Sequence, residues 1–108
     1  MSDPRIEEAR RLHQRGDLPR AIAAYSEVLA ADPEVADVWH LKAAAEQQAG
    51  RLEQARESVQ RAIAAGGEKP PYLLLDGLIL HDLGDVVQAE RRFARVVELN
   101  PNLAAGHF

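Results

Sequence analysis

Four histidines are the side chains best suited to chemistry, because imidazole binds metal ions and transfers protons: His13, His40, His81 and His107. A zinc site needs its donors within about 2.1 Å of one point. His13 and His81 occupy equivalent positions two copies apart in a repeating sequence, and successive packed helices lie ~8–10 Å apart. His40 is displaced from His81 by seven positions of the repeat, which is about 10 Å along a helix. The spacing therefore predicts neither a metal site nor a cofactor.

Nucleophilic and acid–base catalysis lack a suitable set of residues. Ser26 and Ser58 have no histidine at a spacing that would build a catalytic triad. Glu7-Glu8 and Asp82 are typical of solvated helix faces and turns rather than of an acid–base pair. The chain has no cysteine, which excludes a thiol nucleophile, disulfides and thiolate metal sites. We therefore expect a protein that is not an enzyme.

Composition narrows the function classes further. The 108 residues suit one domain, and their net charge of −4 argues against a nucleic-acid surface, which needs a basic stripe. The one basic cluster, Arg91, Arg92 and Arg95, is predicted to lie on the exposed side of the last helix. No apolar stretch is long enough to span a membrane. The charged start, MSDPRIEEARR, predicts a cytoplasmic protein without a signal segment.

The positions of three glycines define the predicted elements. Gly16, Gly50 and Gly84 stand 34 residues apart. An alanine follows each glycine by five residues, and a bulky apolar residue follows each alanine by four: Ala21, Ala55 and Ala89, then Tyr25, Val59 and Phe93. A fixed period of this length indicates one supersecondary unit copied along the chain. Here the unit is predicted to be a helix, a glycine turn and a second helix.

Local signals place the helix ends. Ser2 or Asp3 suits the start of the first helix, and Asp17 is predicted to cap the second. Asp32-Pro33 ends the second helix, because the residue before a proline is pushed out of the helical region. The last two helices are expected over about residues 71–83 and 86–99.

These offsets resemble the tetratricopeptide repeat family, whose signature places an aromatic residue and then a proline after the alanine. Ala21–Tyr25–Pro33 and Ala89–Phe93–Pro101 match it fully, and Trp39 stands where the family has a tryptophan. The second copy departs from the signature, because Lys42 and Glu46 occupy its leucine and tyrosine positions. The surface of that copy is therefore expected to be atypical.

The resemblance implies an all-α fold, a right-handed α-solenoid of three antiparallel helix-turn-helix repeats over residues 2–35, 36–69 and 70–103. Residues 104–108 would begin a fourth, truncated helix pair, and residues 1–108 would form a single domain. Small residues are expected where the two helices of a repeat cross: Ala9, Ala43 and Gly77 in the first helices, and Ala21, Ala55 and Ala89 in the second. Neighbouring repeats would bury their apolar faces against one another.

In this family the first helices line the concave side, so the resemblance implies a scaffold that binds a peptide or helix of a partner protein there. The expected peptide-binding residues project from the first helix of each copy: Ile6, Arg10, His13, Gln14, His40, Ala44, Gln47, Gln48, Leu74, Leu78, His81 and Asp82. Leu74 and Leu78 would anchor apolar side chains, and the polar members would form hydrogen bonds. Because Arg10 is the only lysine or arginine among them, a clamp for the carboxylates of a chaperone tail is not expected.

Two other functions stay open. The chain suits the N-terminal part of a larger enzyme, a transferase or hydroxylase, whose repeats present a polypeptide to a catalytic domain. It also suits self-association as a homodimer, because the apolar stripe of the last helix is too wide for its own partner helix to cover. The residues expected at that contact are Phe93, Val96, Val97, Leu99 and Phe108.

Overall fold

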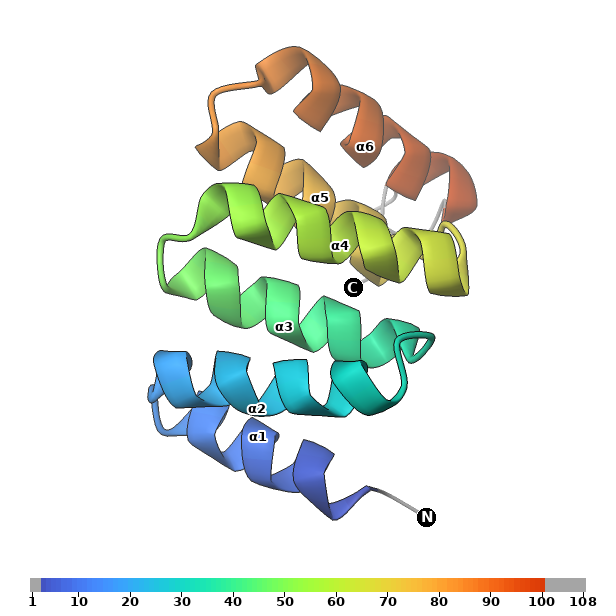
Figure 1. Cartoon of the computed structure of the whole chain (residues 1–108). Coiled ribbons are helices and arrows are strands. Elements are labelled where there is room, and N and C mark those ends of the chain that lie inside the picture. Colours follow the sequence, from blue (N-terminus) through green and yellow to red (C-terminus); the bar gives the residue numbers. More distant parts are fainter. Residues whose placement is uncertain (1–2, 101–108) are drawn as a thin grey trace.

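The computed structural model describes residues 3–100 and consists, over that range, of helices and the turns between them (Figure 1). The helices are α1 (Pro4–Gln14), α2 (Leu18–Ala31), α3 (Ala36–Gln48), α4 (Leu52–Gly66), α5 (Pro70–Asp82) and α6 (Val86–Leu99). They stack in chain order, and the most extensive contacts join α1 to α2, α3 to α4 and α5 to α6. The expected all-α array of antiparallel helix pairs is confirmed. The start of a fourth pair, proposed at residues 104–108, lies outside the described residues.

The turn inside each pair ends the first helix in the same way. The three turn glycines have φ angles of 82°, 79° and 88°, which glycine adopts without strain: Gly16, Gly50 and Gly84. In the first pair the N–H of Gly16 donates to the carbonyl of His13, and the N–H of Asp17 donates to the carbonyl of Leu12 at 2.9 Å. Equivalent bonds recur at the other two turns. This pairing satisfies carbonyls that a helix end leaves free, so the glycine period is confirmed as the period of the turns.

The helix starts follow the predicted signals with one exception. Asp3 caps α1 by accepting a hydrogen bond from the Arg5 N–H at 2.9 Å. The Asp17 side chain makes no such bond at α2, and its Oδ2 lies 3.4 Å from the guanidinium of Arg20. A capping side chain accepts from the second or third helical N–H. The second residue of α2 is Pro19, which lacks this donor, and the Asp17 carboxylate contacts the side chain of the third, Arg20, instead of its N–H. The prediction that Asp17 caps α2 was therefore wrong.

Small residues lie where the helices of a pair cross, as expected. The alanines predicted at these crossings are all 0–1% exposed: Ala9, Ala21, Ala43, Ala55 and Ala89. Gly77 is buried as well, and a Cβ atom built on it would stand 2.5 Å from the ring of Phe93. Tyr25 and Val59 are fully buried between successive helices. The core is thus continuous along the stack, because each helix covers the apolar side of the next.

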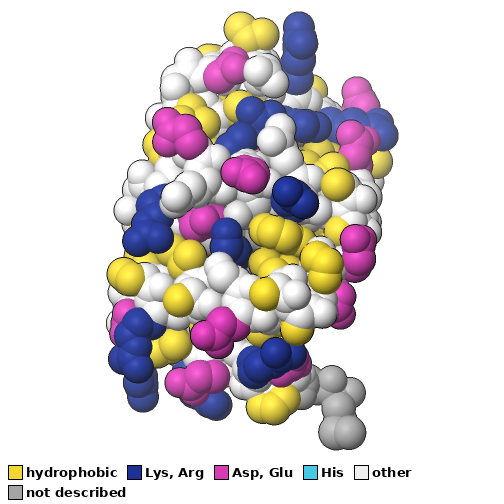
Figure 2. All heavy atoms as spheres, in the orientation of Figure 1, with side chains coloured by type: hydrophobic (Ala, Val, Ile, Leu, Met, Phe, Trp, Pro, Cys, Tyr) yellow, Lys and Arg dark blue, Asp and Glu magenta, His cyan; other side chains and the backbone are white. Residues whose placement is uncertain are grey.

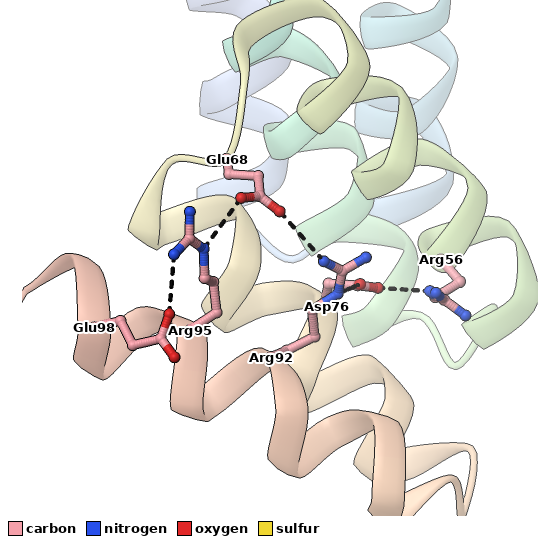
Figure 3. A network of polar contacts seen from close by, with 6 residues as sticks. All are labelled: Arg56, Glu68, Asp76, Arg92, Arg95 and Glu98. Carbon is pink, nitrogen blue, oxygen red and sulfur yellow. Dashed lines mark hydrogen bonds and ion pairs between the residues drawn. The ribbon is translucent and has the colours of Figure 1, made fainter.

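The basic cluster of the last helix is not simply an exposed surface, as the sequence had suggested. Asp76 of α5 is fully buried, and its Oδ2 accepts a hydrogen bond from Arg92 Nε at 2.8 Å. Its Oδ1 lies 2.7 Å from Arg56 Nε of α4, at an angle too bent for a hydrogen bond. Glu68 continues the network to Arg95 at 3.1 Å (Figure 3). These ion pairs link α4, α5 and α6.

Candidate functional site

The predicted peptide-binding residues lie on the first helices of the three pairs, α1, α3 and α5. Polar contacts join each first helix to the next, always between residues 35 positions apart. His13 Nε2 is 2.9 Å from Gln48 Oε1, and Gln47 Nε2 donates to Asp82 Oδ2 at 3.3 Å. We call the surface made by these three helices the first-helix face. The contacts hold its polar side chains in a row that crosses all three pairs.

Every predicted site residue on this face is accessible to a partner. One group is exposed, and consists of Arg10, Gln14, Gln48, Leu74, Leu78, His81 and Asp82. The other is half-buried, and consists of Ile6, His13, His40, Ala44 and Gln47. Leu74 and Leu78 lie one turn apart on α5 and are 43% and 44% exposed. They form an apolar patch at the α5 end of the row, as the sequence predicted.

The first-helix face is hollowed between α1 and α3. The larger hollow, about 430 Å³, lies between α1, the end of α2 and the start of α3. The smaller, about 300 Å³, is lined by His13, Tyr25 and Gln48. Both are lined by Arg10 and Leu41, so they adjoin. We call the two together the α1–α3 groove. Sequence reasoning missed Tyr25 and Leu41 as groove residues, because both also read as ordinary apolar core positions.

Burial shifts the pKa of three ring side chains at or beneath this face toward the uncharged form: Tyr25, His40 and Tyr72. Burial raises the pKa of Tyr25, whose hydroxyl is 3.1 Å from His13 Nδ1. Burial lowers the pKa of His40, with nearby Asp37 acting in the opposite direction. The His40 ring packs on Tyr72 at 5.1 Å between centroids. Burial, together with a hydrogen bond to Asp37, raises the pKa of Tyr72 to about 12. At neutral pH these three groups are therefore uncharged, and the two buried tyrosine hydroxyls already have partners inside the protein.

The atypical residues of the second pair point inward rather than to the surface. Glu46 is 2% exposed, and its carboxylate accepts hydrogen bonds from Ser58 Oγ at 2.6 Å and Lys42 Nζ at 3.1 Å. Lys42 Nζ also donates to Ser58 at 3.2 Å. This cluster replaces the apolar contact that the family signature places there, so the expected atypical surface is instead a buried polar cluster. It lies beside a hollow of about 370 Å³ walled by Trp39.

The rest of the surface is mixed in character. Figure 2 shows a face on which basic and acidic side chains alternate with apolar ones, and no histidine is visible there. Within residues 3–100, no three His, Cys, Asp or Glu side chains gather closely enough to hold a metal ion. Over the same residues no helix combines the length and apolar character needed to cross a bilayer.

Comparisons with known proteins agree with this architecture. The profile of the tetratricopeptide repeat family matches residues 12–79. A search among curated proteins found no match. Among solved structures, the second such domain of Spaghetti (RPAP3) bound to the HSP90 peptide SRMEEVD is 24% identical, with a TM-score of 0.85 and 90% of each chain covered.

Two further solved structures contain bound peptides. The second domain of human RPAP3 in complex with the HSP70 peptide SGPTIEEVD is 25% identical, with a TM-score of 0.86. That match covers 90% of this chain and 81% of the other. The Yersinia enterocolitica type III secretion chaperone SycD, with a peptide of the translocator YopD, is 18% identical at a TM-score of 0.87. It covers 92% of this chain and 76% of that chain.

Proposed function

The chain belongs to the tetratricopeptide repeat family, and from this premise we propose that it is a protein–protein interaction module. It binds a peptide or helix of a partner protein across the first-helix face. The observation that carries this proposal is the α1–α3 groove. It adjoins a row of polar side chains that are not buried in the core. Peptides bound to structurally similar domains support it. The role requires no catalytic group or cofactor, and we expect it to be exercised in the cytoplasm.

The two ends of the first-helix face offer a partner different kinds of side chain. The α1–α3 end supplies hydrogen-bonding groups, His13 and Gln48 among them, around a hollow. The α5 end supplies Leu74 and Leu78, which suit apolar anchors of the partner. The acidic peptides SRMEEVD and SGPTIEEVD belong to the relatives. Arg10 is the single lysine or arginine among the proposed binding residues, so we do not assign those ligands to this chain.

A triple variant tests the binding face. The variant combines His40→Ala, Gln47→Ala and Leu74→Glu. It thereby changes an imidazole, an amide and an apolar side chain of the face, and none of the three is buried. We expect the triple variant to lose the proteins that the parent chain captures in a quantitative pull-down read by mass spectrometry. Circular dichroism should show the same helical content for both, because none of the three residues is buried.

The matched control changes accessible residues on the second helices: Gln54→Ala, Gln60→Ala and Val87→Glu. It should keep the captured proteins. Partner capture that survives in the triple variant and disappears in the control would place binding on the second helices and overturn the proposal.

Self-association is a second candidate function, favoured by exposed apolar side chains on α6. Val97 and Leu99 are 43% and 40% exposed, as the sequence predicted. Val96 is 4% exposed and faces the core, so its expected place at a dimer contact was wrong. Phe93 is half-buried and packs toward Gly77. Phe108 lies outside the described residues. We propose a two-fold dimer in which each α6 covers the other through Val97 and Leu99.

A further inference from the structure

The larger hollow of the α1–α3 groove combines an apolar floor with an acidic rim. We propose that it takes a lysine or arginine side chain of the bound peptide, an inference that rests on the proposed peptide-binding function. The aliphatic stem of that side chain lies on the floor, and its cation lies among the carboxylates of the rim. The hollow thereby selects partners with a basic residue at this position.

The floor of the hollow is aliphatic. It is made by side chains from α1, α2, the α2–α3 turn and α3: Ile6, Val28, Val35, Val38 and Leu41. Val28 and Val38 are nearly inaccessible, while the other three are half-buried and present carbon to the hollow. A surface of this kind gains free energy when a methylene chain covers it. Lysine and arginine side chains carry such a chain below their charge.

The rim of the hollow is acidic. Four carboxylates and two guanidinium groups line it, and one of each, Asp3 and Arg5, pair with one another at 2.9 Å. The remaining carboxylates are those of Glu7, Asp32 and Asp37, and all three line the hollow from accessible positions. Arg10 is the one guanidinium left to oppose them within the lining, and it also lines the adjoining hollow. The rim therefore keeps an excess of negative charge.

The three carboxylates approach the hollow from different elements. Glu7 projects from α1, Asp32 ends α2, and Asp37 lies in the first turn of α3. Asp32 Oδ1 accepts a hydrogen bond from the Glu34 N–H at 3.3 Å, and Asp37 Oδ1 accepts one from the Tyr72 hydroxyl. In each of these two carboxylates the hydrogen bond engages one oxygen, Oδ1. Carboxylates gathered around one hollow select the charge of the side chain that enters it, because they attract a basic side chain and repel an acidic one.

The test uses four small probes that differ only in the side chain. They are the N-acetyl, N-methylamide derivatives of arginine, lysine, norleucine and glutamate, each titrated into the 15N-labelled 108-residue chain. Amide chemical shifts report both the place and the strength of binding. We expect the two cationic probes to move the signals of Asp32, Val38 and Leu41, and to bind roughly threefold to tenfold more tightly than norleucine. Glutamate should bind most weakly.

A charge-neutralising variant checks the role of the rim. Glu7→Gln with Asp32→Asn should reduce binding of the cationic probes to the level of norleucine, while norleucine binding stays unchanged. The amide introduced at position 32 keeps the oxygen that accepts from Glu34, so the end of α2 is preserved. The matched control, Glu53→Gln with Glu90→Gln, removes the same charge from exposed positions on α4 and α6 and should retain the cation preference.

The inference is overturned if norleucine or glutamate binds as tightly as the cations. It is also overturned if Glu7→Gln with Asp32→Asn leaves the preference intact, or if no probe moves a signal of the groove. None of these results removes the proposed function, which is decided by partner capture in the His40, Gln47 and Leu74 variant. A chain that still captures its partners through the first-helix face, without a cation preference, would bind a different kind of side chain in this hollow.

Discussion

Replacing Asp76 with asparagine tests whether the buried ion network holds the last helix pair in the stack. The carboxylate of Asp76 is fully buried and contacts Arg92 at 2.8 Å and Arg56 at 2.7 Å. Figure 3 shows it between these two guanidinium groups. The substitution Asp76→Asn would keep the shape of the side chain but remove its charge. Arg56 would then lose its counter-charge, and Arg92 would keep only Glu68, which lies 4.0 Å away.

The expected cost follows from the burial of the three groups. Removing one partner of a buried ion pair costs about 3–5 kcal/mol, because the other charge is left desolvated. The side chains of Arg56 and Arg92 are 21% and 28% exposed, so water compensates them in part. We therefore expect Asp76→Asn to lower the free energy of unfolding by about 2–4 kcal/mol. That is a large share of the roughly 5–15 kcal/mol that stabilises a domain.

The control is the exposed ion pair at the outer end of the same network. Arg95 and Glu98 lie 2.9 Å apart, with side chains 42% and 63% exposed. Exposed pairs contribute about 0–1 kcal/mol, so Glu98→Gln should change stability very little. A double-mutant cycle with Arg92→Gln isolates the buried contact. In that cycle the second substitution should restore part of the stability that Asp76→Asn removes.

Urea unfolding followed by two signals provides the assay. Fluorescence of Trp39 reports on the central helix pair, and far-ultraviolet circular dichroism reports on all helices. Because helix pairs in such arrays contact only their neighbours, the variant should lose part of its helical signal before Trp39 responds. The reasoning is refuted if Asp76→Asn and Glu98→Gln have equal free energies of unfolding, since the buried network would then contribute no more than a surface pair.

Two further predictions concern alkaline pH and self-association. The pKa of Tyr72 is raised to about 12, whereas a tyrosine in an unfolded chain ionises near pH 10. The unfolded state therefore loses this proton first, and the free energy of unfolding should fall between about pH 10 and 12. In urea titrations, Tyr72→Phe should make the free energy of unfolding depend less on pH over this range. An unchanged pH dependence would contradict the raised pKa of Tyr72. In sedimentation velocity at micromolar concentrations, the parent chain should dimerise and Val97→Glu should be a monomer, while Val87→Glu, a change at a more exposed position, should remain dimeric. A parent chain that sediments as a monomer at every concentration would rule the dimer out.

Local signals in the sequence determined the helix pairs and their turns. A glycine at a fixed period takes the left-handed conformation at each turn, and the N–H groups that follow close the same hydrogen bonds each time. The alanines and the bulky apolar residues at fixed offsets from these glycines became the buried crossings and the core. These features could be predicted because each depends on residues within one or two helical turns, and because the same pattern recurs in each copy of the repeat.

The resemblance to the repeat family suggested the residues of the first-helix row, but the hollows beside that row could not be predicted from the sequence. His13 and Leu78 fall in that row when the three copies are aligned with the repeat register of the family. The α1–α3 groove depends on how far α1, α2 and α3 are separated when packed, and Leu41 and Tyr25 line it only because of that separation. Likewise, Val96 and Val97 are adjacent apolar residues, and only packing decides that the first is buried and the second exposed.

Only the tertiary structure decided which carboxylates are buried and which groups surround them. Glu46 and Asp76 lie on helices whose sequence does not reveal what stands opposite them. Asp76 is paired with Arg56 and Arg92 from two other helices. Glu46 pairs with Lys42 one turn earlier on its own helix, but it also needs Ser58 of α4 as a hydrogen-bond donor. A carboxylate is tolerated inside a protein only when such partners surround it. Whether a charged residue faces water or an ion pair therefore depends on helices far away in the chain, which a single sequence does not bring together.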